Sequence, residues 1–400
     1  MVSAVRHGVS IRGVARRFGV ALRTVQYWVK YAGDRRLDRI DFASKPTGAT
    51  PPHNHTRPEM ETLLVDTRRE LRDTSALGEY GALAVHQELT LRGVTSVPSV
   101  STIHRVFRRN GLLTRRRIRH PAPPPGWYLP NLETAAVELD SFDFIEELRI
   151  ENGPLADVLN GVSLHGGLPA SWPAESPVSA IWTLERLVEH WRLFGLPAYA
   201  QFDNDTRFQG AHQFADSFGR IVRLCLGLGV VPVFAPPRET GFQGAVEGFN
   251  SRWKKGVWNR FHHDSLPTLA THSEQYVTAY RIRHAKRIEG APPRAPFPRD
   301  WSFNYQLKPR GRLIYVRRAD EQGRVRVLGH TTHLRDGWGY RLTRCEVLFD
   351  EKVIRFFGLR RREPSEQPLL KEVHYDFASR LFSDSTDRTQ PMPSLPHSGD

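Results

Sequence analysis

The chain has 400 residues, 39% of them hydrophobic and 10% aromatic, which suits about two to four folded domains rather than a disordered protein. No apolar run approaches the roughly 18 residues that span a bilayer, and the arginine-broken N-terminus lacks the apolar segment of a secretory signal. The two cysteines, Cys225 and Cys345, are far apart and lack metal-ligand spacing, which excludes a disulfide framework and a cysteine-based zinc finger. We therefore expect a cytoplasmic protein without membrane contacts.

The net charge of +14 is distributed unevenly. Residues 1–130 carry a net charge of +12, residues 131–300 carry −3, and residues 301–400 carry +5. Basic flanks around a slightly acidic middle indicate DNA-binding regions on a core that uses carboxylates.

Residues 11–30, IRGVARRFGVALRTVQYWVK, have the pattern of a helix-turn-helix, within a DNA-binding domain that we place at 1–45. Ala15 is small enough for two helices to cross closely, and Gly19 can adopt the left-handed turn between them. A generic pair of amphipathic helices is the alternative. The predicted contacts of the second helix to phosphates or base edges are Arg23, Thr24, Gln26, Tyr27 and Lys30.

A second helical DNA-binding domain is expected at 56–120, after a Pro/Gly/Thr-rich linker at 41–56. Its first segment, PEMETLLVDTRREL, has amphipathic helical spacing, and YGALAVHQELTLRGVTSVPSVSTIHRVFRRNGL resembles another helix-turn-helix. Ser99 or Ser101 is the expected cap of a helix that ends in two predicted DNA contacts, Arg108 and Arg109. The arginine- and proline-rich run that follows is either a solvated linker or a strand along the DNA backbone.

Residues 131–290 alternate between strand and helix patterns, which predicts an α/β domain. The segments AAVELDSFDF, ADVLNGVSL and AYAQFD are the predicted strands, and SAIWTLERLVEHWRLFG is a helix with Ile181, Leu184, Leu187, Val188 and Trp191 on one face. Short alternating segments with glycine-containing turns predict a small β-barrel or sandwich at 300–362. The Ser/Pro/Asp/Thr-rich tail at 383–400 is expected to be disordered.

Three acidic residues stand out by their positions. Asp140 lies in an apolar strand, Asp203 ends another strand, and Glu247 opens a helix after a Gly-rich loop. A carboxylate among apolar neighbours is costly unless a cation or hydrogen bonds compensate it. Two strand-borne aspartates and a helix-borne glutamate are suited to a pair of Mg²⁺ ions (Mn²⁺ is an alternative), the usual arrangement for phosphoryl transfer.

These motifs resemble those of insertion-sequence DDE transposases, which have a retroviral-integrase-like core. The matching stretches are ELD at Asp140, FDNDTRF at Asp203 and FAPPRETGFQGAVEGFN at Glu247, and the resemblance extends over roughly residues 5–360. It implies an RNase H-like catalytic core with Asp140, Asp203 and Glu247 as catalytic and metal-binding residues. In that family, 3′-hydroxyl ends of a mobile element are exposed and joined to target DNA.

The chain departs from the family pattern in three places. Between Asp203 and Glu247 lie 43 residues, against about 35 in the wider superfamily, which indicates an insertion between them. Asp205 stands where the family usually has glycine, and it adds a charge beside the predicted site. The Gly/Pro-rich segment 164–177 is an expected active-site loop.

Asp143 competes with Asp140 for the first position of the triad. Three residues apart on a strand, the two side chains point to opposite faces, so one metal site cannot use both. We choose Asp140, because the family's first aspartate follows an apolar strand of this kind. In the helix of Glu247, an apolar stripe is expected to pack on the sheet, and the adjacent polar residues Asn250, Ser251 and Lys254 are predicted DNA contacts.

The sequence therefore predicts a multidomain DNA transposase: helix-turn-helix units, an α/β RNase H-like core and a C-terminal β-barrel. It would cleave and join double-stranded DNA, both element ends and target, as a homo-oligomer associated with the nucleoid. One alternative is a domesticated, catalytically silent DNA-binding regulator with the same fold. Another, an RNase H-type nuclease without strand transfer, is disfavoured by the paired helix-turn-helix units.

Because residues 1–130 hold most of the net positive charge, we predict that this segment binds DNA alone with strongly salt-dependent affinity. Arg23→Ala or Gln26→Ala should reduce discrimination of the element end by roughly 1–3 kcal/mol if these side chains reach base edges. Titrations on element-end and random DNA at several salt concentrations test both statements. A flat salt response contradicts the first, and equal loss on random DNA reassigns the residues to phosphate contacts.

Overall fold

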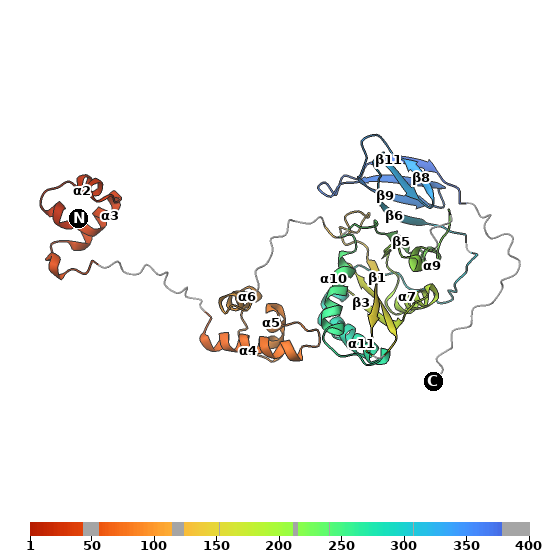
Figure 1. The fold of residues 1–400 in the computed structure, drawn as a ribbon, viewed down its shortest axis with the longest axis horizontal. Helices are drawn as coiled ribbons and strands as arrows, with labels where there is room; N and C mark the ends of the chain where they lie inside the picture. Colours follow the sequence, from red (N-terminus) through yellow and green to blue (C-terminus); the bar gives the residue numbers. More distant parts are fainter. Residues whose placement is uncertain are drawn as a thin grey trace. The chain divides into compact units, whose positions relative to one another are not determined.

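The computed structural model describes residues 1–42, 56–113, 124–151, 153–210, 215–239, 241–306 and 308–377 (Figure 1). The chain divides into two compact units, Met1–Pro58 and Glu59–Asp400. The second unit contains all three regions that the sequence analysis treats as separate domains after residue 56. The tail at 383–400, most of the linker at 41–56 and most of the arginine-rich run at 114–126 lie outside the described residues.

The first unit is helical, as the sequence predicts. Ser10 caps the second helix by accepting a hydrogen bond from the Gly13 amide at 3.1 Å, and Gly19 ends it in the left-handed conformation with φ 61°. Val14 and Val25 are buried between the second and third helices. The elements are α1 (Val2–Arg6), α2 (Ile11–Phe18), α3 (Leu22–Ala32) and a short 3₁₀ turn, η1 (Leu37–Arg39).

Three further helices follow in the second unit: α4 (Pro58–Thr74), α5 (Ala82–Leu91) and α6 (Val100–Arg109). Of the two serines considered as the cap of α6, Ser99 takes the role and accepts from the Thr102 amide at 3.4 Å. Leu64, Val85 and Phe107, one from each helix, are fully buried together and form the core of this helical group.

The centre of the second unit is a mixed α/β arrangement built on a nine-stranded sheet (Figure 1). The sheet order is β11-β10-β9-β6-β5-β4-β1-β2-β3. The first three strands are antiparallel, whereas β4 and β5 run parallel to β1. The strands of this half are β1 (Leu139–Arg149), β2 (Leu155–Ser163), β3 (Pro169–Glu175), β4 (Tyr199–Phe202) and β5 (Val231–Phe234).

Helices cover both faces of this half of the sheet. On one face, Leu187 and Trp191 of α7 pack with Phe142 and Phe202 from the strands. On the other face, α10 packs on β1 and β2, α11 packs on β3, and the predicted apolar stripe of α10 is fully buried. Ile181, predicted to face inward, is 42% exposed. The helices of this half are α7 (Ala180–Phe194), α8 (Thr206–Gln209), α9 (Arg220–Gly227), α10 (Gly244–Trp253), the π-turn η2 (Lys254–Trp258), α11 (Leu266–Arg283) and α12 (Ala285–Glu289).

Half of the expected active-site loop at 164–177 is a strand. Residues 169–175 form β3, which pairs with β2 from Ala156↔Glu175 to Val162↔Pro169. As an edge strand it accommodates Pro169 and Pro173, whose missing amide hydrogens face no partner strand. The proline content that suggested a loop is therefore explained by the position of the strand in the sheet.

The predicted β-barrel is also corrected by the sheet topology. Strand β6 pairs in parallel with β5, at Val233↔Ile314 and Phe234↔Tyr315, and β9, β10 and β11 continue from it antiparallel. Without β6, β5 would be an edge strand with unpaired backbone groups. The strands are β6 (Arg312–Arg318), β9 (Leu342–Leu348), β10 (Val353–Leu359) and β11 (Leu369–His374), and β7 (Arg324–Val327) and β8 (His330–His333) form a separate two-stranded ladder.

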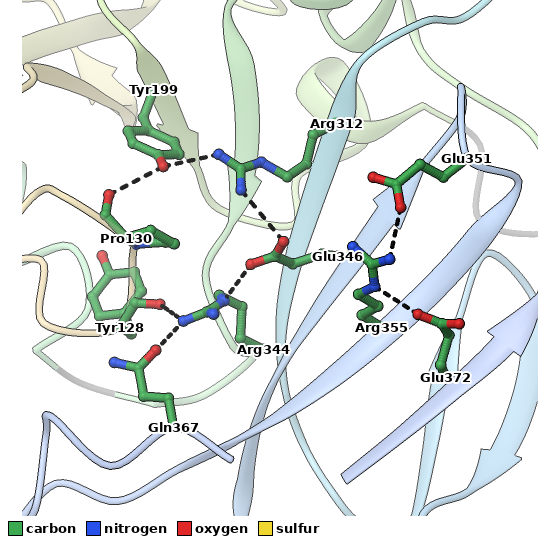
Figure 2. Close-up of polar contacts among 10 residues, drawn as sticks. All are labelled: Tyr128, Pro130, Tyr199, Arg312, Arg344, Glu346, Glu351, Arg355, Gln367 and Glu372. Atoms are coloured by element: carbon green, nitrogen blue, oxygen red, sulfur yellow. Dashed lines mark hydrogen bonds and ion pairs between the residues drawn. The ribbon is translucent and has the colours of Figure 1, made fainter. Parts of the chain in front are cut away.

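A buried polar network joins the C-terminal strands to the rest of the sheet (Figure 2). Arg344 pairs with Glu346 at 2.6 Å and donates to the Tyr128 carbonyl oxygen at 2.9 Å. Glu346 also accepts from Arg312, whose guanidinium reaches the Tyr199 hydroxyl of β4 at 3.0 Å. Because Arg344 and Glu346 are each at most 5% exposed, removing one would leave a buried charge without its partner. None of the helices among the described residues is long and apolar enough to cross a membrane.

We predict that the C-terminal strands unfold together with the α/β half, since Phe356, Tyr315, Phe202 and Trp191 belong to one buried cluster. Phe356→Ala should lower the free energy of unfolding by about 3–5 kcal/mol in a single transition, measured by urea denaturation with tryptophan fluorescence and circular dichroism. Leu369→Ala, at a 52% exposed position, should change it by less than about 0.5 kcal/mol. If two unfolding transitions are seen and Phe356→Ala shifts the midpoint of only one of them, the C-terminal strands form an independent domain.

Candidate active site

The parallel pairing of β1 with β4 places two aspartates side by side. The paired residues include Asp140↔Ala200 and Ser141↔Gln201, and the Ser141 hydroxyl donates to the Gln201 side-chain oxygen at 3.4 Å. Asp143 and Asp203 each lie two residues further along their strands. Side chains repeat every second residue on one face, so the two aspartates follow the Ser141–Gln201 pair on the same face.

Helix α10 brings Glu247 to this pair. The Asn250 side-chain amide donates to Asp143 Oδ2 at 2.8 Å, and Asn250 Oδ1 accepts from Asn160 of β2 at 2.8 Å. Glu247 lies three residues before Asn250, on the same side of the helix, and is exposed in its first turn. Asp143 of β1, Asp203 just after β4 and Glu247 of α10 therefore lie in the same region, where the charges of Asp203 and Glu247 act on Asp143.

The electrostatics of Asp143 reflect this crowding. Burial, together with the nearby charges of Asp203 and Glu247, raises the pKa of the Asp143 carboxyl to about 6, and the Phe144 amide opposes the rise. Burial likewise raises the pKa of Asp203, although the Asp205 amide donates to its Oδ1 at 3.0 Å. Ionised carboxylates here repel one another, which a bound cation would relieve.

Asp140, the predicted first ligand, is not part of this group. It is 1% exposed, and both of its oxygens are bound by Arg294, with Nη1 at 3.0 Å from Oδ2. Trp191 Nε1 donates to the same Oδ2 at 3.1 Å. The charge of Asp140 is thus compensated by an internal arginine on the α7 face, opposite to Asp143, as the alternation of side chains along the strand requires.

Asp205 has a partner of its own. Its carboxylate accepts from the Arg207 amide at 2.7 Å, which caps α8, and from Arg207 Nε at 2.9 Å. Arg207 also pairs with Glu146 and Asp157, and its guanidinium lies 3.8 Å from the centre of the Phe144 ring. The charge that Asp205 adds beside the site is therefore met by a guanidinium, and sequence reasoning did not identify Arg207.

The structure separates the predicted DNA contacts of α10 by exposure. Ser251 and Lys254 are exposed, together with Arg252 and Lys255. Asn250 is instead 9% exposed and bound to Asp143 and Asn160. Both ends of its side chain are bound within the protein, so Asn250 is placed to orient a carboxylate, and its contact with DNA stays a prediction.

The predicted DNA contacts near the N-terminus are mostly on the surface. Arg23, Gln26, Tyr27 and Lys30 are exposed on α3, and Thr24 is half-buried. On α6, Arg108 and Arg109 are exposed, and Arg109 pairs with Glu61 of α4. The four exposed α3 side chains and Arg108 are therefore accessible to a ligand.

Within the described residues, no three His, Cys, Asp or Glu side chains stand close enough together to hold a metal ion as they are. No protein-family model matches the chain, and no curated protein matches it.

Among the solved structures that are similar to the chain are two of retroviral integrases. A chain of the simian T-cell lymphotropic virus intasome in complex with PP2A regulatory subunit B56 gamma is 14% identical, with a TM-score of 0.32, over 66% of this chain and 84% of that chain. The catalytic core domain of BIV integrase is 15% identical, with a TM-score of 0.27, over 37% of this chain and 97% of that chain. At TM-scores of this size, the site has to be judged from its own residues.

The buried group around Asp140 predicts a pH effect on stability. Burial lowers the pKa of His190 to about 4, with Asp140 opposing the shift and Arg294 and Arg281 adding to it. An unfolded histidine has a pKa of about 6.5, so the unfolded chain binds this proton first and stability falls as the pH drops from 6.5 towards 4. Between pH 6.5 and pH 4 the free energy of unfolding of the wild type should fall by up to roughly 3 kcal/mol more than that of His190→Gln, which has no imidazole to protonate. Urea denaturation of both proteins across this pH range measures the difference. Parallel curves for the two proteins would contradict this.

Proposed function

We propose that the chain is a metal-dependent polynucleotidyl transferase that cleaves DNA at the ends of a mobile element and joins them to target DNA. The observation that carries the proposal is that the charges of Asp203, just after β4, and of Glu247 on α10 lie near enough to Asp143 of β1 to raise the pKa of its buried carboxyl. Asp143 takes the place that the sequence analysis assigned to Asp140. The resemblance of the FDNDTRF and FAPPRETGFQGAVEGFN stretches to DDE transposases supports the same activity.

The donor set fits a hard divalent cation in its chemistry. All three side chains offer anionic oxygens, which Mg²⁺ and Mn²⁺ prefer. Burial and then the neighbouring charges raise the pKa of Asp143, and a bound cation would relieve the repulsion among these charges. Asp143, Asp203 and Glu247 would hold up to two ions, with Glu247 turning towards the aspartates when a cation is present. When bound, the ions would polarise the scissile phosphate and lower the pKa of the attacking water or DNA 3′-hydroxyl.

The chain's own residues position the reacting groups. The Asn250 amide holds one oxygen of Asp143, and the Asp205 amide fixes one oxygen of Asp203. Beyond Glu247, the exposed Ser251, Arg252, Lys254 and Lys255 can bind the phosphates on either side of the scissile bond. The π-turn at Lys254–Trp258 adds a residue to one helical turn and changes the direction of the basic residues that follow.

Binding of the element ends is assigned to the helical regions before the catalytic core. Arg23, Thr24, Gln26, Tyr27 and Lys30 on α3 are the proposed contacts to base edges and phosphates, with Arg108 and Arg109 as further phosphate contacts. Two ends have to be brought together before joining, so we expect a homo-oligomer on double-stranded DNA.

The test is Mg²⁺- or Mn²⁺-dependent cleavage and joining of labelled element-end DNA, with a gel-shift assay of the same substrate. Asp143→Asn, Asp203→Asn and Glu247→Gln should each abolish the chemistry, because a carboxylate that holds the cation is lost. DNA binding should persist or tighten, since a negative charge facing phosphates has been removed. Combining the substitutions should cause no further loss, because groups that act as one unit are not additive.

Glu274→Gln, which removes an exposed carboxylate from α11, is the matched control and should keep full activity. Asp140→Asn should behave differently from the triad variants: it leaves Arg294 buried without its partner and should destabilise the fold by about 3–5 kcal/mol. Full joining activity in Asp143→Asn or Glu247→Gln would refute the assignment. A wild-type chain that binds the ends without cleaving them would instead indicate a catalytically silent DNA-binding regulator.

A further inference from the structure

The segment that leads into α10 is held by residues of the C-terminal strands. It runs from Ala235, after β5, to Gln243, and all of it except Thr240 is described. Glu239 lies near its middle, and its carboxylate is bound by two guanidinium groups. Arg318 at the end of β6 binds Oε1, and Arg361, two residues after β10, binds Oε2 at 3.2 Å.

The two arginines are themselves fixed in place. Arg318 also donates to the Tyr340 carbonyl oxygen, and the guanidinium of Arg361 lies 5.2 Å from the centre of the Phe242 ring. The Glu239 side chain is 18% exposed, whereas each arginine is 45% exposed. The carboxylate is therefore enclosed between two partners from the C-terminal strands, and it does not lie on an open surface.

The next residues of the segment carry the constraint to the helix. Phe242 is buried against the Tyr128 ring, and its carbonyl oxygen accepts from the Tyr128 hydroxyl at 2.9 Å. Gln243 Nε2 donates to the Phe142 carbonyl oxygen of β1 at 3.4 Å, and the Gln243 carbonyl oxygen accepts from the Glu247 amide at 2.9 Å. The position of this segment thus sets where α10 begins.

The backbone before Glu239 is in a conformation that needs support. Arg238 has a φ of 58°, in the left-handed region that residues with a side chain rarely adopt. The ion pairs that follow hold this turn in place.

We infer that Glu239 is a positioning residue: its pairing with Arg318 and Arg361 fixes the entry to α10 and so places Glu247 beside Asp143 and Asp203. The C-terminal strands then contribute to the geometry of the candidate active site and do not act as a separate DNA-binding domain. The part of this inference that concerns activity rests on the proposed function. The part that concerns the segment itself does not.

The experiment is hydrogen–deuterium exchange of the full chain, read on peptides covering residues 235–250. In Glu239→Gln, the negative charge disappears and one side-chain oxygen becomes an NH₂ group. Both ion pairs are then lost, and one of the two guanidinium groups faces a donor where it had an acceptor. Exchange in this segment should become roughly tenfold faster, as expected for a loss of about 1.4 kcal/mol of local stability. Arg318→Ala and Arg361→Ala should each produce a smaller increase in the same peptides.

Arg355→Ala is the matched control. Arg355 also binds two glutamates from the C-terminal strands, Glu351 and Glu372, at 2.6 Å each, and Figure 2 shows that this pair of contacts is separate from the buried network. It should leave exchange at 235–250 unchanged. Unchanged exchange in Glu239→Gln, or the same increase in Arg355→Ala, would overturn the inference.

DNA cleavage and binding separate positioning from general destabilisation. Glu239→Gln should lower the cleavage rate at saturating DNA by roughly tenfold, while the Kd for element-end DNA and the melting temperature stay close to the wild-type values. A rate equal to the wild type despite faster exchange would show that the ion pairs of Glu239 with Arg318 and Arg361 do not position Glu247. If the wild-type chain has no cleavage activity but shows the expected exchange pattern, the proposed function is refuted and the structural role of these ion pairs is kept.

Discussion

The parallel register between β1 and β4 is the constraint on which the candidate site depends. It aligns Asp140 with Ala200 and Ser141 with Gln201, and so sets Asp143 beside Asp203. A shift of one residue would turn one of the two aspartates to the other face of the sheet. The contact from Asn250 to Asp143 then ties α10 to the same place, so the third carboxylate is positioned by the register as well.

The two faces of β1 compensate buried acids in different ways. Asp140 is neutralised within the fold by Arg294, and the segment that carries this arginine is held to the core by the Leu196↔Ala295 bridge. Asp143 has the Asn250 amide as its side-chain partner, and burial together with two neighbouring carboxylates raises its pKa. A buried carboxylate that is paired with an arginine leaves no uncompensated charge inside the fold. A group of carboxylates without a cationic side chain as partner is instead the arrangement that can bind a metal cation.

The C-terminal strands connect to the site through backbone and side chains together. The pairing of β6 with β5 extends the sheet, and the Arg344–Glu346–Arg312 network reaches Tyr128 and Tyr199. Tyr128 in turn holds the Phe242 carbonyl just before α10. Residues more than 100 positions apart in the sequence thus support one short segment.

Local sequence signals were sufficient for the elements and for part of the site. Helical spacing and the serine and glycine caps predicted α2, α3, α6, α7 and α10, and the apolar segments around Asp140 and Asp203 predicted their strands. The prominence of Asp203 and Glu247 also came from sequence, because a carboxylate at the end of a strand or after a glycine-rich loop is a local feature. The choice between Asp140 and Asp143 could not be made from the neighbouring sequence. Alternation along the strand shows only that the two aspartates lie on opposite faces of the sheet. The tertiary structure decides which of them faces the candidate site, because α7 and Arg294 pack on one face and α10 packs on the other. The β-barrel was predicted for a similar reason. The sequence pattern of alternating strands is the same whether the strands close into a barrel or extend an existing sheet. The edge of β5 with which β6 pairs exists only in the folded structure.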